Sequence, residues 1–413
     1  MGKFFSDPVE TALQYIYYEN RTGGRRGKEG FDLLTAASQA GDGDADCVLA
    51  RCLSGTQYVW SGHHFPEDDQ KVMKLLHRSI ERGSALGVLV AKRSGAFTPV
   101  WQSRSPLTLQ QAFQLVLEKA AGGDAFCQYT IANTYFWWDF LSIQGKSRED
   151  FPDPQAFQAY MTQEITKCED WFWRAFRGGM YLAGNNLYNY YLKGDEGYVA
   201  PQPEKAAEIF KIGAEMGYPL HQKCYADDLK EAGDLAGAAH WYLQAAENGQ
   251  PGLWYNLGEA YLEAKGVERD IPKAVFYYQK AMEEGSIGGY NAMGDLYYRG
   301  LGVPQDRAKA FECFHYVNEH SDNKYCYPFL AVCYLEGWGT APDYERAYNL
   351  AWETKDWAPR SRYALGRIYG EGLGMPADIP KGVDFLQRAG DLPEAVEELK
   401  HYKKTLFGRW VRR

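Results

Sequence analysis

A five-residue pattern recurs four times in the C-terminal half of the chain. Its first copy is Leu257-Gly258-Glu259-Ala260-Tyr261, and the later copies occupy residues 293–297, 330–334 and 365–369. The copies begin 36, 37 and 35 residues apart. A period of this length is typical of stacked helical hairpins, because a single hairpin cannot bury its apolar face without neighbours. The sequence therefore predicts an all-α fold, a solenoid of antiparallel helix hairpins.

Each copy continues with the signals that end one helix and begin the next. Leu257 and Tyr261 lie four residues apart and share one helix face, and the small Gly258 leaves room for a neighbouring helix. A glycine-rich turn follows every copy, which predicts a helix end because glycine adopts positive φ without a Cβ clash. Acidic residues then recur at the expected N-cap of the second helix: Asp270, Asp306, Asp343 and Asp378.

The combined pattern resembles the Sel-one-like repeat, a relative of the tetratricopeptide repeat with a longer turn. Residues 257–274 and 293–310 match it almost position for position. The two later units depart from it, since Ala331 replaces a glycine and Gly382 replaces an alanine. Residues 226–251 have the short-turn spacing of a tetratricopeptide unit instead. The resemblance implies an alpha-alpha superhelix, a right-handed solenoid that serves as an interaction platform.

The N-terminal half carries weaker versions of the same signals. Residues 131–135 follow the first-helix pattern, as does the series Leu187, Tyr191, Gly194. Several further segments read as helices that end on glycine, but their spacing is irregular. If the period holds throughout, we expect about ten or eleven helix pairs in the chain.

We expect three regions along the chain. They are residues 1–219, with diverged hairpins, longer loops and an insertion at 139–160; residues 220–390, with the regular repeats; and residues 391–413, with a C-terminal capping helix and a basic tail. The capping helix is predicted to begin at Asp391, as N-cap, with Pro393 in its first turn.

Composition indicates a cytoplasmic protein. The N-terminus lacks the apolar run of a signal peptide, and no stretch of about 20 apolar residues is long enough to span a membrane. The eight cysteines include no CxxC pair and show no regular pairing, which favours reduced and mostly buried thiols.

Charge argues against a nucleic-acid-binding role for the whole chain, since the net charge is −9. Basic residues do gather near the two ends of the sequence, at Arg21, Arg25, Arg26 and Lys28, and at Lys400, Lys403, Lys404, Arg409, Arg412 and Arg413. Two interpretations remain for them: solvated loop and tail, or a patch for an acidic partner or RNA.

Catalytic and cofactor motifs are missing. The sequence contains no GxxxxGK[ST], HExxH or GxSxG motif and no EF-hand loop, and the glycine run at 370–374 is explained as a repeat turn. His63 and His64 stand near Glu67, Asp68 and Asp69, a set that allows either a metal site or helix caps. We expect no catalytic residue, cofactor or required metal.

A non-catalytic protein- or peptide-binding scaffold is the function we expect. In such a stack the first helices line the concave face, and the residues beside their packing positions project there. In the regular repeats these residues are Tyr255, Glu259, Asn291, Asp295, Arg299, Tyr363 and Arg367. Tyrosine and arginine are favoured in binding hot spots, although the tyrosine rings have the alternative of packing on neighbouring units.

The alternative is an enzyme or a small-ligand binder with a pocket near residues 136–140. Phe136, Trp137, Trp138 and Phe140 exceed the aromatic content that one hairpin core needs, and the segment 141–154 departs from the repeat. Loop excursions from a regular scaffold often carry specific function. The aromatic residues either dock this insertion or receive a ligand, and we include Trp137 and Trp138 among the candidate partner contacts.

Overall fold

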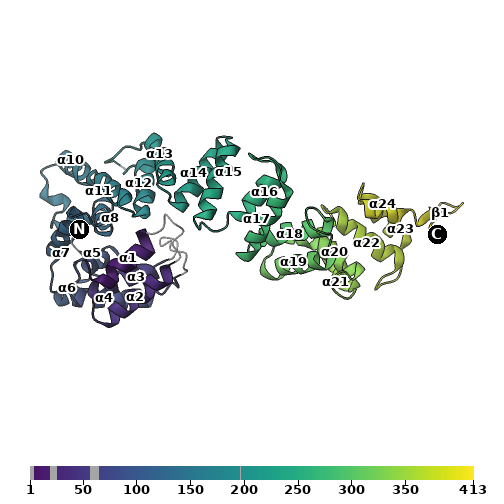
Figure 1. The fold of residues 1–413 in the computed structure, drawn as a ribbon, viewed down its shortest axis with the longest axis horizontal. Helices are drawn as coiled ribbons and strands as arrows, with labels where there is room; N and C mark the ends of the chain where they lie inside the picture. The colour runs from purple at the N-terminus through teal and green to yellow at the C-terminus, as the bar shows by residue number, and fades with distance from the viewer. Residues whose placement is uncertain (1–3, 19–25, 56–64, 196) are drawn as a thin grey trace. The chain divides into compact units, whose positions relative to one another are not determined.

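The computed structural model describes residues 4–18, 26–55, 65–195 and 197–413 (Figure 1). These residues are mostly helical and divide into two compact units, residues 1–250 and 251–413. Within the described residues the main helices pair in chain order as ten hairpins, in agreement with the predicted all-α repeat architecture.

Six hairpins form the first unit, and the first helix of each packs against a second helix. They are α1 (Asp7–Leu13), extended by the π-helical turn η1 (Gln14–Tyr18), with α2 (Gly27–Gln39); α3 (Gly43–Leu53) with α4 (Asp69–Glu81); α5 (Ala85–Arg93) with α7 (Leu109–Ala121); α8 (Ala125–Phe136) with α11 (Lys167–Arg177); α12 (Tyr181–Lys193) with α13 (Pro203–Glu215); and α14 (Pro219–Glu231) with α15 (Leu235–Glu247).

Two of these hairpins carry extra elements in their connections. The short helix α6 (Pro99–Arg104) lies between α5 and α7. The connection between α8 and α11 holds α9 (Asp139–Ile143), the 3-10 turn η4 (Arg148–Asp150) and α10 (Pro154–Ile165). The predicted insertion is therefore largely helical.

The second unit contains four hairpins and a C-terminal cap. They are α16 (Trp254–Glu263) with α17 (Ile271–Glu283); α18 (Ile287–Arg299) with α19 (Arg307–His320); α20 (Tyr327–Glu336), preceded by the 3-10 turn η5 (Lys324–Cys326), with α21 (Tyr344–Thr354); and α22 (Pro359–Glu371) with α23 (Ile379–Arg388). The cap is α24 (Pro393–Leu399), followed by the strands β1 (Tyr402–Lys404) and β2 (Trp410–Arg412).

The C-terminal cap differs from the prediction in two ways. Leu392, and not Asp391, is the N-cap of α24, because Pro393 takes the first helical position. The basic tail also forms an antiparallel hairpin that the sequence did not predict, with Tyr402 opposite Arg412 and Lys404 opposite Trp410. The strands are only three residues long, too short for a recognisable alternating pattern.

The four predicted N-caps of the regular repeats are confirmed. The carboxylates of Asp270, Asp306, Asp343 and Asp378 accept from the backbone N–H three residues later, at 3.0, 3.0, 2.9 and 3.1 Å. The backbone N–H of each aspartate donates in turn to the carbonyl of the repeat tyrosine before it, at 3.0, 3.0, 2.9 and 2.8 Å. One residue thus starts the second helix and fixes the length of the turn.

Left-handed residues end the first helices as predicted, with one exception. Gly300, Gly337 and Gly372 are the C-caps of α18, α20 and α22, with φ of 70°, 71° and 73°. In the first regular repeat a non-glycine residue, Ala264, occupies this position with φ of 58°. Its side chain makes that conformation less favourable than at the other turns.

Large aromatic side chains fill the core of each unit. Tyr17 meets Phe126 edge to face, with ring centroids 5.3 Å apart, and Phe176 stacks on Tyr218 at the same distance. All four side chains are almost completely buried. Seven of the eight cysteines are also buried, and Cys224 is partly exposed, so their burial is as predicted.

Candidate functional site

A cavity of about 990 Å³ lies on the first-helix face of the N-terminal unit. Four successive first helices, α3, α5, α8 and α12, and the residues that follow them supply its wall. The lining residues are Arg51, Ser54, Arg93, Tyr129, Asn133, Phe136, Trp137, Trp138, Asn186, Asn189, Lys193, Gly194 and Asp195. This is the face on which a hairpin stack is expected to bind a partner.

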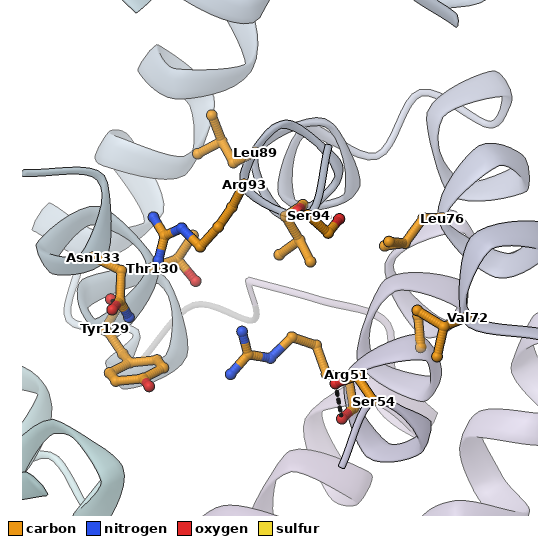
Figure 2. Close-up of a pocket in the computed structure, with 12 residues that line it drawn as sticks. Arg51, Ser54, Val72, Leu76, Leu89, Arg93, Ser94, Tyr129, Thr130 and Asn133 are labelled. Carbon is orange, nitrogen blue, oxygen red and sulfur yellow. Dashed lines mark hydrogen bonds between the residues drawn. The ribbon is translucent and has the colours of Figure 1, made fainter. Parts of the chain in front are cut away.

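A smaller apolar pouch of about 130 Å³ adjoins the cavity. Val72, Leu76, Leu89 and Val90 form its apolar wall, and they come from α4 and α5. Five residues line both hollows: Arg51, Ser54, Arg93, Tyr129 and Asn133. Figure 2 shows the side chains of Arg51 and Arg93 reaching toward the space between α3, α5 and α8. The two guanidinium groups therefore stand where the pouch meets the cavity.

The two arginines differ in their partners. Arg93 donates to Asp139 Oδ2 from Nε at 3.1 Å and from Nη2 at 2.7 Å. Burial lowers the pKa of Arg93, and repulsion from Arg51 lowers it further, against the attraction of Asp139. Among the described residues no carboxylate forms an ion pair with Arg51, whose guanidinium lies 5.8 Å from the ring centre of Tyr129.

Asparagine side chains form the polar part of the cavity wall. Asn133 donates to the carbonyl of Tyr129 at 2.8 Å and accepts from Asn186 Nδ2 at 2.9 Å. Asn189 donates to the carbonyl of Asn185 at 3.0 Å. These bonds fix the amide groups on α8 and α12, an arrangement suited to pairing with the donors and acceptors of a peptide backbone.

Three of these cavity residues occupy one repeat position. Arg51, Asn133 and Asn189 follow a large apolar residue by two positions, as Glu259 follows Leu257. None of the three was among the predicted contacts, because the predicted contacts at this position come from the regular repeats alone. For Asn133 and Asn189 the signal is present in the sequence, because residues 131–135 and the Leu187 series follow the first-helix pattern. Arg51 lies on α3, for which the sequence predicted no first-helix pattern.

The predicted contacts Trp137 and Trp138 line the cavity. Trp137 is 60% exposed, and its ring meets Phe136 edge to face at 4.9 Å. Trp138 has φ of 63° and donates from Nε1 to Asp195 Oδ2 at 2.8 Å. Its left-handed backbone directs the chain from the end of α8 into the insertion. Its indole hydrogen bond connects the end of α8 to the segment after α12.

The insertion packs on itself and on that same segment. Tyr160 donates to Gln144 Oε1 at 2.5 Å, and the Phe151 ring lies 4.8 Å from that of Tyr160. Gln158 donates to the carbonyl of Gly197 at 2.8 Å. None of residues 141–154, all of which are described, lines the cavity. The alternative pocket beside residues 136–138 thus exists, but neighbouring first helices build it instead of the insertion.

A family model, the Sel1 repeat, matches six segments of the chain. They are residues 178–218, 224–250, 255–286, 288–316, 329–351 and 359–393. The first lies in the part predicted to hold diverged hairpins, and the other five cover the regular part. This chain is a Sel1 repeat protein.

Solved structures of low identity align along nearly the whole Sel1 repeat protein. A Sel1 repeat protein from Oxalobacter formigenes is 19% identical, with 97% of this chain and 96% of that chain covered and a TM-score of 0.42. A protective antigen of uropathogenic Escherichia coli, c5321, which displays an SLR fold, is 18% identical, with 90% and 89% covered and a TM-score of 0.41. No curated protein matches the chain.

The predicted contacts on the first two regular Sel1 repeats lie on first helices. Tyr255 donates to Glu259 Oε1 at 2.9 Å, and Arg299 forms an ion pair with Asp295 at 2.5 Å. The Oδ1 atom of Asn291 is buried without a hydrogen-bond partner in the described part of the chain. These side chains are partly or fully exposed, and their role as partner contacts stays a prediction.

The predicted contacts on the last Sel1 repeat are engaged inside the second unit. Tyr363 is only 7% exposed, and its hydroxyl donates to Glu336 at 3.1 Å and accepts from Arg367 at 3.0 Å. Arg367 also pairs with Glu336 at 2.8 Å and with Glu371. Burial and the neighbouring Glu336 raise the pKa of Tyr363 to about 12.

Other candidate sites of the Sel1 repeat protein receive little support. His63 and His64 lie outside the described residues, and Asp68 serves as the predicted cap by accepting from Lys71 N–H at 2.9 Å. No group of three or more potential metal-ligating side chains occurs in the described ranges. Arg21 and Arg25 also lie outside the description, and Lys28 is paired with Asp32 at 2.7 Å. No described helix has the length and apolar character needed to cross a membrane.

Proposed function

We propose that this Sel1 repeat protein is a non-catalytic scaffold that binds a protein or peptide partner on the first-helix face of its N-terminal unit. The observation that carries the proposal is the cavity of about 990 Å³, to which four successive first helices contribute. A wall spread over several repeats suits an extended ligand, which contacts one repeat after another.

The chemistry of the lining supports binding over catalysis. The titratable lining residues are Arg51, Arg93, Tyr129, Lys193 and Asp195. Among the described lining residues there is no histidine, cysteine or glutamate, side chains that often serve as nucleophile or general base. The exposed Trp137 and the amides of Asn186 and Asn189 offer the combination of aromatic anchor and polar contact that is common in peptide recognition.

The second candidate function is binding of a small molecule in the apolar pouch. Its volume of about 130 Å³ is close to that of an engineered cavity of about 150 Å³ that holds benzene. We rank this candidate second because the pouch opens into the much larger cavity. The residues Tyr255, Glu259, Asn291, Asp295 and Arg299 are proposed as a separate partner surface on the second unit.

Cytoplasmic location is also a proposal. Eight free cysteines, seven of them buried, suit a compartment that keeps thiols reduced.

The test is affinity purification with mass spectrometry, comparing Trp137→Ala with a matched control. Trp357→Ala is that control, because Trp357 is similarly exposed (51% against 60%) and lies in the other unit. We expect partners to be lost with Trp137→Ala and kept with Trp357→Ala, and binding of the purified partner to follow the same order. Partners that bind both variants as well as they bind the wild type would contradict the cavity as the binding site.

A further inference from the structure

Arg51 is a cation held in the protein without an anionic counterpart in the described residues. Its electrostatic neighbours are the phenols of Tyr129 and Tyr17 and the thiol of Cys47, none of which is a carboxylate, together with the cation Arg93. Tyr17 and Cys47 are fully buried, so one side of Arg51 faces the core. A charge taken partly out of water is costly unless an opposite charge compensates it. The open side of Arg51 faces the cavity.

The charges around this point do not cancel. Arg93 has one partner, Asp139, and Arg51 repels it. Of the other described lining residues, Lys193 and Asp195 supply one charge of each sign. The mouth of the pouch, which Arg51 and Arg93 both line, therefore has an excess positive charge that an anion would neutralise.

An apolar space lies beside this charge. Val72, Leu76 and Leu89 line the same pouch as Arg51 and Arg93. Its volume of about 130 Å³ has the size of one aliphatic or small aromatic group, by comparison with the cavity of about 150 Å³ that accepts benzene. A ligand that satisfies both features carries an anionic group and an apolar group only a bond or two apart.

We propose that the mouth between Arg51 and Arg93 binds the C-terminal carboxylate of a peptide whose last residue is aliphatic. The side chain of that residue fills the pouch, and the preceding residues run past Asn133, Asn186 and Asn189 toward Trp137. The proposal rests on the proposed scaffold function and names the partner chemistry for it. An aspartate or glutamate side chain would supply the charge but leave the pouch empty, whereas a terminal residue presents both groups from one Cα atom.

The experiment starts from a library of hexapeptides displayed with free C-termini and selected on the full chain. Selected sequences are synthesised with a C-terminal carboxylate and with a C-terminal amide, and their affinities are measured by calorimetry. The amide form lacks the charge-assisted contact of the carboxylate, so it should bind at least about tenfold more weakly. N-acetyl-leucine and N-acetyl-leucinamide serve as minimal probes of the same contact, and free acetate tests whether the carboxylate alone is sufficient.

Three variants separate the charge from the fold. Arg51→Met keeps the aliphatic stem and removes the charge, and it should weaken the carboxylate peptide to the level of the amide. Arg51→Lys should restore part of the affinity. Arg174→Met is the control, because Arg174 lies on α11, is 52% exposed and pairs with Asp170. A melting temperature of Arg51→Met equal to or above that of the wild type would show that the variant is folded and that the charge is kept at a cost to stability.

The outcomes distinguish this inference from the scaffold function. Selected peptides that end in an aliphatic residue, lose affinity as amides and lose it again with Arg51→Met would support it. Peptides that bind the cavity equally well as amides, or that depend on an internal acidic residue, would overturn it and leave the scaffold function standing. A library without any binder would count against both.

Discussion

The ring of Tyr278 on α17 lies against Gly258 on α16, so closely that a Cβ atom at Gly258 would stand 2.5 Å from two ring carbons. The same relationship recurs between Gly294 and Phe314, at 2.8 Å, and between Gly366 and Leu386, at 2.6 Å. In each regular hairpin that keeps the repeat glycine, a large side chain of the second helix thus occupies the space that a side chain on the first helix would need.

Gly258→Ala should therefore destabilise the second unit, although alanine is the better helix former. In an exposed helix this change stabilises by about 1 kcal/mol. Here we expect a loss of about 1–3 kcal/mol from overpacking, measured by urea denaturation. The destabilisation caused by Gly258→Ala should be smaller in a Tyr278→Leu variant, because the aromatic ring that occupies the space is absent there. A stabilising effect of Gly258→Ala alone would contradict the packing.

Ala264→Gly should stabilise the protein. Ala264 is left-handed, with φ of 58°, where the corresponding repeats have glycine. Glycine removes the Cβ clash, which stabilises the folded state, but it also increases the conformational entropy of the unfolded chain. The net effect should be an increase of about 0.5–1 kcal/mol in the free energy of unfolding. The reciprocal change Gly300→Ala should cost about 1–2 kcal/mol, since Gly300 has φ of 70°. If Ala264→Gly and Gly300→Ala had the same urea denaturation midpoint, this would contradict a left-handed conformation at these turns.

Acid should weaken the first unit through His221. Burial lowers the pKa of His221 to about 3, and neither ring nitrogen has a hydrogen-bond partner in the described part of the chain. The rings of Phe176, Phe210 and Tyr218 surround it at 5.2–5.7 Å. Because the unfolded histidine has a pKa near 6.5, the unfolded state binds the extra proton, and stability is complete above that pH and falls as the pH drops toward 3.

Between pH 7 and 4.5 this effect should amount to about 2–3 kcal/mol, at about 1.4 kcal/mol per pH unit below 6.5. The measurement is the free energy of unfolding at both pH values for the wild type and for His221→Leu. The variant should lack this share of the pH dependence. Identical pH profiles would mean that His221 is solvated or paired in the folded protein.

Tyr363 should behave as a core residue. Its ring is 7% exposed and its hydroxyl joins Glu336 to Arg367, so Tyr363→Ala should cost about 3–5 kcal/mol, whereas Tyr363→Phe should cost about 1 kcal/mol. Thermal unfolding followed by circular dichroism measures both. A Tyr363→Ala variant that melts with the wild type would instead place the ring in an accessible groove, as the sequence had allowed.

The regular repeats were predictable from sequence because each signal there is local. The four aspartate caps and the glycine helix ends depend on residues within one hairpin, and the period sets which helices pair. The prediction failed at Ala264 because the surrounding turn imposes a conformation that its own side chain disfavours.

The candidate site was harder to predict because it combines residues from four hairpins with unequal spacing. Trp137 and Trp138 were found from their excess over the needs of one core. Arg51 and Arg93 were not predicted, because the sequence shows no clear pattern for the first helices α3 and α5. In addition, an arginine without a carboxylate partner can be identified only when its neighbours in the structure are known. Tyr363 occupies the same repeat position as Tyr129, and both side chains are nearly buried. Tyr129 nevertheless lines the cavity, whereas Tyr363 is hydrogen-bonded to Glu336 inside the second unit.

The hydrogen bond from each capping aspartate to the preceding repeat tyrosine has a consequence for how such arrays change in size. This hydrogen bond recurs in all four C-terminal hairpins, although the first turn has Ala264 where the others have glycine. Removal or duplication of one whole period therefore joins two turns that share the bond. We therefore expect that one hairpin-length repeat, here called a cassette, can be added or removed at this end with the aspartate–tyrosine hydrogen bond of each turn kept. We expect engineered versions with one cassette more or fewer to fold, and their reach toward a partner to grow or shrink in steps of one hairpin.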